Sequence, residues 1–176
     1  MSGQLKILLY ICLVVGILYF LQSKYSLFEI SFNNPNQGKE KLEKESEINS
    51  LEILNSEGQK IYVELEIADT VESRKQGLSD RRELGDYQGM LFIFDTEGGY
   101  SFWMKDMYLP LDLIYIDGTS YIVDIIEDVQ PCSETECVSF IPSVPFKYVL
   151  EVNGGFAKLN RVNIGNAVIF DISSEE

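Results

Sequence analysis

Short strand-like segments separated by turn residues fill the chain from Leu51 onward, and they constrain its fold more than any other feature. In the segment Lys60–Ala68, apolar residues alternate with polar ones, which is typical of a strand with one buried face. Met90–Phe94 is a continuous apolar segment, and Asp117-Gly118 is a hairpin signal. The pattern predicts an α+β domain with a mainly antiparallel, strongly curved or barrel-like sheet of seven or eight short strands.

One or two short helices are expected beside this sheet. Asp69 or Thr70 can cap a helix over Val71–Gln76, and Gly77 can end it. A second helical turn is expected over Phe156–Asn160. The remaining expected strands are Leu51–Leu54, Ser101–Lys105, Leu111–Ile116, Tyr121–Val129, Tyr148–Val152 and Ala167–Ile172.

An apolar segment of 15 residues, Ile7–Leu21, lies near the N-terminus. As a helix it is roughly 22 Å long, and with Lys6 and Lys24 extended toward the headgroups it nearly crosses a bilayer. We expect residues 1–26 to form a signal anchor or transmembrane helix that contacts the membrane through residues 5–23. The alternative is a cleaved signal peptide and a secreted domain, although no small-x-small cleavage site follows the apolar segment.

The charge of the chain changes after a polar tether, which we place at residues 27–50. The globular domain expected over residues 51–176 holds nine Lys and Arg against 23 Asp and Glu, so it carries the whole formal net charge of −14. Such an acidic domain repels phosphate backbones, so no nucleic-acid partner is expected. The chain has no histidine, which excludes Ser-His-Asp triads, Cys-His dyads and most zinc sites, and we expect no metal and no cofactor.

Cys132 and Cys137 lie in one loop and are separated by four residues. This spacing suits neither a zinc site nor a thioredoxin-type redox pair, and it favours a structural disulfide over two reduced thiols. Because disulfides persist in oxidising compartments, the acidic domain is expected outside the cytoplasm, either periplasmic or on the cell surface.

Four sequence blocks between Glu64 and Asp171 form a specific combination. They are Ala68-Asp69-Thr70 with Arg74, Gly77-Leu78 and Arg81; Gly89-Met90-Leu91-Phe92-Ile93-Phe94; Phe102-Trp103-Met104-Lys105 with Pro110-Leu111-Asp112 and Ile116-Asp117; and Pro131-Cys132 and Cys137 with Tyr148-Val149-Leu150-Glu151-Val152-Asn153-Gly154-Gly155 and Ile164-Gly165-Asn166. In these blocks the chain resembles the domain-of-unknown-function family 192, also called uncharacterised protein family 0127. Ser79, Asp106-Met107 and Asn166 depart from the family's usual residues. The resemblance implies a small β-rich domain, often behind a signal peptide or anchor, and it implies no reaction.

The candidate site centres on Trp103, the only tryptophan. On a strand, Trp103 and Lys105 would share one face, and an aromatic plate beside a cation suits sugars, aromatic rings or carboxylate ligands. Asp112 would extend this polar cluster, or it would pair with Lys105 and lock a hairpin. Arg81 and Glu151 are further candidates, with structural pairing or solvation as the alternative.

Three functions are compatible with these residues. The first is a membrane-tethered, non-catalytic module that binds a small molecule or glycan. The second is an extracytoplasmic enzyme that uses Lys105, Asp112 or Glu151, which would have to share a cleft. The third is a structural accessory of a membrane complex, which would need a flat apolar surface.

Overall fold

The computed structural model describes residues 4, 12–15, 48–132 and 137–173, and it divides into two units, Met1–Glu45 and Ser46–Glu176. In the first unit, Gln4 and the segment 12–15 are helical and exposed. No helix in the described ranges is long and apolar enough to cross a bilayer. The helix and the tether expected over residues 1–50 lie almost wholly outside the described residues, so both stay predictions.

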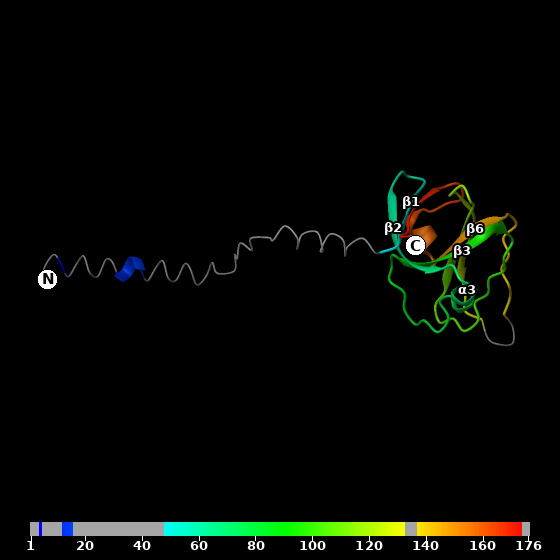
Figure 1. Cartoon of the computed structure of the whole chain (residues 1–176), viewed down its shortest axis with the longest axis horizontal. Coiled ribbons are helices and arrows are strands. Elements are labelled where there is room, and N and C mark those ends of the chain that lie inside the picture. The colour runs from blue at the N-terminus through cyan, green and yellow to red at the C-terminus, as the bar shows by residue number, and fades with distance from the viewer. Residues whose placement is uncertain (1–3, 5–11, 16–47, 133–136, 174–176) are drawn as a thin grey trace. The chain divides into compact units, whose positions relative to one another are not determined.

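The second unit contains a seven-stranded sheet and two short helices, seen at the right of Figure 1. In chain order the elements are β1 (Ser50–Leu54), β2 (Lys60–Ala68), α3 (Val71–Gln76), β3 (Gln88–Gly98), β4 (Leu111–Ile116), β5 (Ile122–Val129), β6 (Phe146–Asn153), α4 (Phe156–Asn160) and β7 (Ala167–Asp171). Both helices have the bounds that the sequence predicts.

The strands follow the order β5-β4-β6-β3-β2-β1-β7 in the sheet. Five of the pairings are antiparallel, and β2 and β3 are parallel, with Glu64 opposite Gln88 and Ala68 opposite Phe92. The sheet is therefore mainly antiparallel, as expected, with one parallel pairing that makes it mixed. The long connection through α3 accounts for that pairing, because it carries the chain back so that β3 runs in the direction of β2.

The sheet is strongly curved, as expected, and its two ends meet in a half-barrel. Tyr121, just before β5, forms a bridge with Ala167 at the start of β7. The Ile122 amide donates to the Asn166 carbonyl at 3.0 Å, and the Val168 amide donates to the Ser120 carbonyl at 2.9 Å. These bonds give the two edge strands backbone partners at one end.

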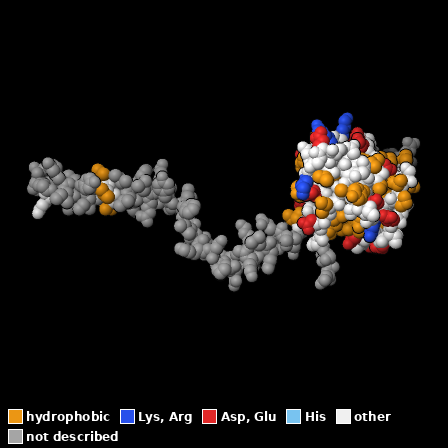
Figure 2. Space-filling model, turned by 90° about the horizontal axis from the view of Figure 1, so that it is seen from above, with side chains coloured by type: hydrophobic (Ala, Val, Ile, Leu, Met, Phe, Trp, Pro, Cys, Tyr) orange, Lys and Arg blue, Asp and Glu red, His pale blue; other side chains and the backbone are white. Residues whose placement is uncertain are grey.

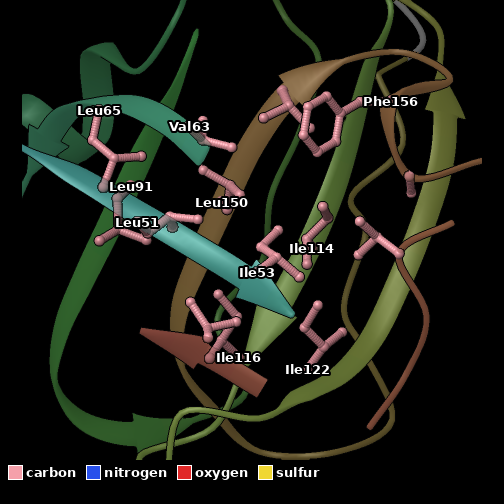
Figure 3. Close-up of a cluster of buried hydrophobic side chains, with 14 residues drawn as sticks. Leu51, Ile53, Val63, Leu65, Leu91, Ile114, Ile116, Ile122, Leu150 and Phe156 are labelled. Carbon is pink, nitrogen blue, oxygen red and sulfur yellow. The ribbon is translucent and has the colours of Figure 1, made fainter. Parts of the chain in front are cut away.

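Each face of the sheet buries its own apolar cluster. One cluster, drawn in Figure 3, contains Leu51, Ile53, Val63, Leu65, Leu91, Ile114, Ile116, Ile122, Leu150 and Phe156 among its members. The other contains Met90, Phe92, Phe94, Phe102, Met104, Leu113, Tyr115, Phe146 and Val149. Strands buried on both faces read as continuous apolar segments, which explains the composition of β3 and β4.

The expected strand Ser101–Lys105 is absent. This segment makes only two isolated bridges, from Phe102 to Phe140 and from Lys105 to Cys132. Because the two bridges have different partners and Asp106 then adopts a positive φ of 59°, no ladder continues along it. The alternation of side chains still holds: Phe102 and Met104 are buried, whereas Trp103 and Lys105 are exposed.

Candidate functional site

The alternation of β6 places a carboxyl group in the second apolar cluster. Leu150 and Val152 belong to the cluster of Figure 3, whereas Val149 and Glu151 point to the opposite face. Glu151 lies between Met90 on β3 and Leu113 on β4 and is only 6% exposed. Apolar neighbours on both adjacent strands therefore hold this side chain inside the domain.

A cavity of about 290 Å³ opens beside Glu151, between the α3 region and the segment that follows β3. Its apolar wall contains Phe92, Phe94, Tyr100, Phe102, Trp103 and Met107. Its polar lining contains Arg74, Lys75, Gln76, Ser79, Ser101 and Glu151. An apolar cavity with a few polar groups is the usual form of a small-molecule site.

The Glu151 carboxyl forms no ion pair and no side-chain hydrogen bond within residues 48–132 and 137–173. Burial raises its pKa to about 8, so the group is predominantly protonated at neutral pH. On the same face of the sheet, the Tyr115 hydroxyl is buried without a partner in this part of the chain, and burial raises its pKa as well. The floor of the cavity thus contains a neutral carboxyl that can donate and accept a hydrogen bond.

Arg74 brings a positive charge to the same cavity. It lies on α3, whose start is fixed by a capping box between Thr70 and Ser73. Its Nη1 donates to the carbonyls of Asp69 and Ile93, the latter at 2.7 Å, and its guanidinium lies over the Phe94 ring at 5.2 Å from the centroid. These contacts orient the guanidinium, and its Nε and Nη2 have no hydrogen-bond partner in the described part of the chain.

The aromatic wall is rigid because its rings pack on one another. Phe94 and Tyr100 are stacked with centroids 3.9 Å apart, and Phe92 and Phe102 meet edge to face at 5.3 Å. Trp103 is 49% exposed and adds its ring to the same lining. Of the five candidate site residues, Trp103 and Glu151 are the two that share this cavity.

Lys105 and Arg81 lie outside the lining of this cavity. Lys105 is exposed and forms no ion pair with Asp112 among the described residues. Arg81 makes a two-pronged ion pair with Glu66, in which Nη2 lies 2.7 Å from Oε2. This pair joins the segment after α3 to β2, which is a structural role.

Asp112 is fully buried and is used by the backbone. Its Oδ1 accepts from the amides of Asp128 at 2.8 Å and Gly155 at 2.9 Å, and its Oδ2 accepts from the Ala157 amide at 2.8 Å. The carboxylate thereby satisfies amides at the start of α4 and in the bulged end of β5. No lone pair is directed toward the cavity, because Asp112 shares its face with Val152.

The structure joins Cys132 and Cys137 by a disulfide, with the Cα atoms 5.2 Å apart. Within residues 4, 12–15, 48–132 and 137–173, no group of three or more acidic or cysteine side chains is placed to hold a metal ion.

A family model described as "Uncharacterized ACR", DUF192, matches residues 52–170. The chain belongs to the DUF192 family. No curated protein matches it. The chain is similar to a solved structure from Sinorhizobium meliloti 1021, which is described as a candidate transcription regulator. The two share 32% sequence identity and a TM-score of 0.66, and the match covers 69% of this chain and 92% of that one. A protein of unknown function from Novosphingobium aromaticivorans DSM 12444 is also similar, with 28% identity and a TM-score of 0.63, over 68% and 83% of the two chains.

The four sequence blocks that carry the resemblance to the DUF192 family meet at this cavity. Arg74 comes from the first block, Phe92 and Phe94 from the second, Trp103 from the third and Glu151 from the fourth. Sequence reasoning missed Arg74 and the aromatic wall as site residues. The signal available was that Arg74, Phe92 and Phe94 belong to the same four sequence blocks as Trp103 and Glu151.

Proposed function

We propose that the domain is a non-catalytic binding module for a small molecule, and that the cavity beside Glu151 is its binding site. The observation that carries this proposal is the Glu151 carboxyl, which is 6% exposed, lines an aromatic cavity and has no partner in the described protein. This carboxyl is largely removed from solvent and borders the cavity, so a ligand that hydrogen-bonds to it gains specificity at this position.

The other lining groups support the same proposal. The cavity volume of about 290 Å³ suits a molecule of roughly a dozen non-hydrogen atoms. Stacked aromatic rings give it an apolar wall, and Trp103 remains exposed at the edge. Ring packing and the Arg74 hydrogen bond to the Ile93 carbonyl fix these groups in place, which lowers the entropic cost of binding.

The geometry gives no support to the enzyme that the sequence left open. An enzyme that uses Lys105, Asp112 or Glu151 would need these side chains to share one cleft. Asp112 and Glu151 are on opposite faces of the sheet, and Lys105 is exposed outside the cavity lining. Among the described residues that line the cavity, Glu151 is the only carboxyl group, so the pair of carboxylates that glycosidase chemistry needs is not formed there.

A role in nucleic-acid binding fits this chain poorly. Residues 51–176 carry the whole net charge of −14. On the face of the globular unit seen in Figure 2, Lys and Arg side chains are interspersed with acidic and apolar ones and form no continuous basic surface.

We further propose that the domain is tethered to a membrane by residues 5–23 and works outside the cytoplasm. The apolar segment Ile7–Leu21 and the Cys132–Cys137 disulfide support this location. Labelling of intact cells with a membrane-impermeant thiol reagent tests it in a Cys12→Ser variant. Cysteines that become labelled from outside only after reduction are the expected result, and free thiols protected from the outside reagent would contradict it.

The binding proposal is tested by the fluorescence of Trp103, the only tryptophan, in the full chain held in mild detergent. A library of sugars, amino acids, nucleotides and aromatic acids is screened for a change in emission, and hits are confirmed by calorimetry. A Ser101→Trp variant, which fills the cavity opening, is expected to lose calorimetric binding of every hit.

Ser143→Trp is the matched control, since Ser143 is exposed and lies outside the lining. The Ser143→Trp variant should bind each hit with the same calorimetric affinity as the original chain. A screen without hits, or hits that bind Ser101→Trp with unchanged affinity, would overturn the proposed site.

A further inference from the structure

We propose that the ligand of this site is an elongated organic carboxylate with an aromatic or apolar body, whose anionic end binds Arg74 and whose far end carries a neutral hydroxyl that bonds to Glu151. This inference rests on the proposed function and names the ligand class for the same cavity.

The two polar groups lie at different points along β3. Glu151 is opposite Met90, whereas Arg74 Nη1 donates to the carbonyl of Ile93, three residues further along the strand. At about 3.3 Å per residue this offset corresponds to roughly 10 Å. A ligand that reaches both groups must therefore be elongated, with its functional groups at opposite ends.

The local charge selects an anion at the Arg74 end. Although the domain as a whole is strongly acidic, the ionisable side chains that line the cavity are Arg74, Lys75 and Glu151, and Glu151 is protonated at neutral pH. Arg74 forms no ion pair within the described ranges, and its Nε and Nη2 remain available as donors. A planar fork of this kind matches a carboxylate.

The Glu151 end suits a neutral group. The carboxyl lies among apolar side chains with no cation beside it, so its protonated form is the stable one and can donate to and accept from a hydroxyl. An ammonium group would have to ionise Glu151 and would also meet the positive charges of Arg74 and Lys75. The lining therefore favours a hydroxyl over an amine.

The surface between the two ends is aromatic. Phe92, Phe94 and Phe102 form a packed wall, with Trp103 at its exposed edge. Such a wall favours a flat apolar body over a sugar ring with many hydroxyls, because it offers those hydroxyls no partners.

Calorimetry with three matched probes tests this ligand class on the full chain. The probes are 3-(4-hydroxyphenyl)propionate, 3-phenylpropionate, which lacks the hydroxyl, and tyramine, which replaces the carboxylate by an ammonium group. We expect the hydroxylated acid to bind at least 10-fold more tightly than either of the others.

Substitutions then assign each end of the probe. Arg74→Gln should weaken binding of the hydroxylated acid at least 10-fold, whereas Lys158→Gln, at an exposed cation outside the cavity, should change it less than twofold. Glu151→Gln keeps a hydrogen-bonding group and should retain binding within about threefold, whereas Glu151→Leu should lose the preference for the hydroxyl. Circular dichroism confirms that each variant is folded.

The outcomes separate this inference from the proposed function. Tighter binding of tyramine, or equal binding to Arg74→Gln and the original chain, would overturn the carboxylate assignment. If a non-acidic ligand from the library bound and Ser101→Trp abolished it, the binding site would stand and the ligand class would be wrong. If no probe and no library compound bound, both would fail.

Discussion

Asp112 and Glu151 lie on neighbouring strands, one residue apart in register, and face opposite sides of the sheet. Asp112 is opposite Val152 and accepts three backbone hydrogen bonds, whereas Glu151 is opposite Leu113 and lines the aromatic cavity. Two acidic side chains on one pair of strands therefore have different roles. The partnered carboxylate organises the backbone, and the unpartnered carboxyl is available to a ligand.

Replacing Asp112 by alanine is expected to destabilise the domain strongly. The amides of Asp128, Gly155 and Ala157 would lose their acceptor, of which the Ala157 amide is buried and the other two are partly buried, and an unsatisfied buried donor costs about 1–3 kcal/mol. We expect the free energy of unfolding in urea to fall by roughly 4 kcal/mol. Asp95→Ala, at an exposed carboxylate, is the matched control, and equal stability of the two variants would contradict the role of Asp112.

Glu151 should make stability depend on pH in a defined direction. Because its pKa is about 8 in the folded chain and 4.5 when unperturbed, only the unfolded chain releases this proton between those values. The group therefore destabilises the folded state by about 1.4 kcal/mol for each pH unit above 4.5, up to about pH 8.

Glu151→Gln removes this titration. The variant's free energy of unfolding, measured relative to the original chain, should rise steadily from pH 5 to pH 8 and then level off. A difference that is constant over this range would show that Glu151 is ionised in the folded protein.

Reduction of the Cys132–Cys137 bridge should have a modest effect. The loop it closes is short, so its chain-entropy contribution is about 2 kcal/mol. The urea midpoint should fall with dithiothreitol, and a Cys132→Ser/Cys137→Ser variant should match the reduced protein and no longer respond to the reagent. The cavity lining includes neither cysteine. Probe binding should therefore be unchanged under conditions in which the reduced protein remains folded.

Arg81→Gln and Lys105→Gln should leave binding of any confirmed ligand unchanged within twofold. Arg81 pairs with Glu66, and Lys105 is exposed outside the lining. Since exposed ion pairs contribute little, Arg81→Gln should also cost less than about 1 kcal/mol of unfolding free energy. A large loss of calorimetric affinity in either variant would place the site elsewhere.

Thr70→Ala should loosen the helix that carries Arg74. Loss of the capping box is expected to lower the free energy of unfolding by about 1 kcal/mol. Thr70→Ser, which keeps the hydroxyl, should restore most of it. Amide hydrogen exchange in Val71–Gln76 measures the local effect, and unchanged exchange in Thr70→Ala would show that α3 does not depend on its cap.

The sequence by itself determined the family and most elements of this protein, with the expected strand Ser101–Lys105 as the exception. Alternation in β2, the capping residues of α3 and the turn after β4 are local patterns, and local backbone preferences decide them. The half-barrel form and the cysteine pairing also followed from patterns within the chain.

Only the tertiary structure decided which side chains meet. The register of β4 and β6 turned Asp112 and Glu151 to opposite faces, and a shift of one residue in β4 would have put both carboxyl groups on the same face. The contact between Arg74 and Ile93 and the parallel pairing of β2 with β3 join segments distant in sequence. Such pairings depend on the whole packed sheet rather than on local propensity, so the candidate site became visible only in the folded domain.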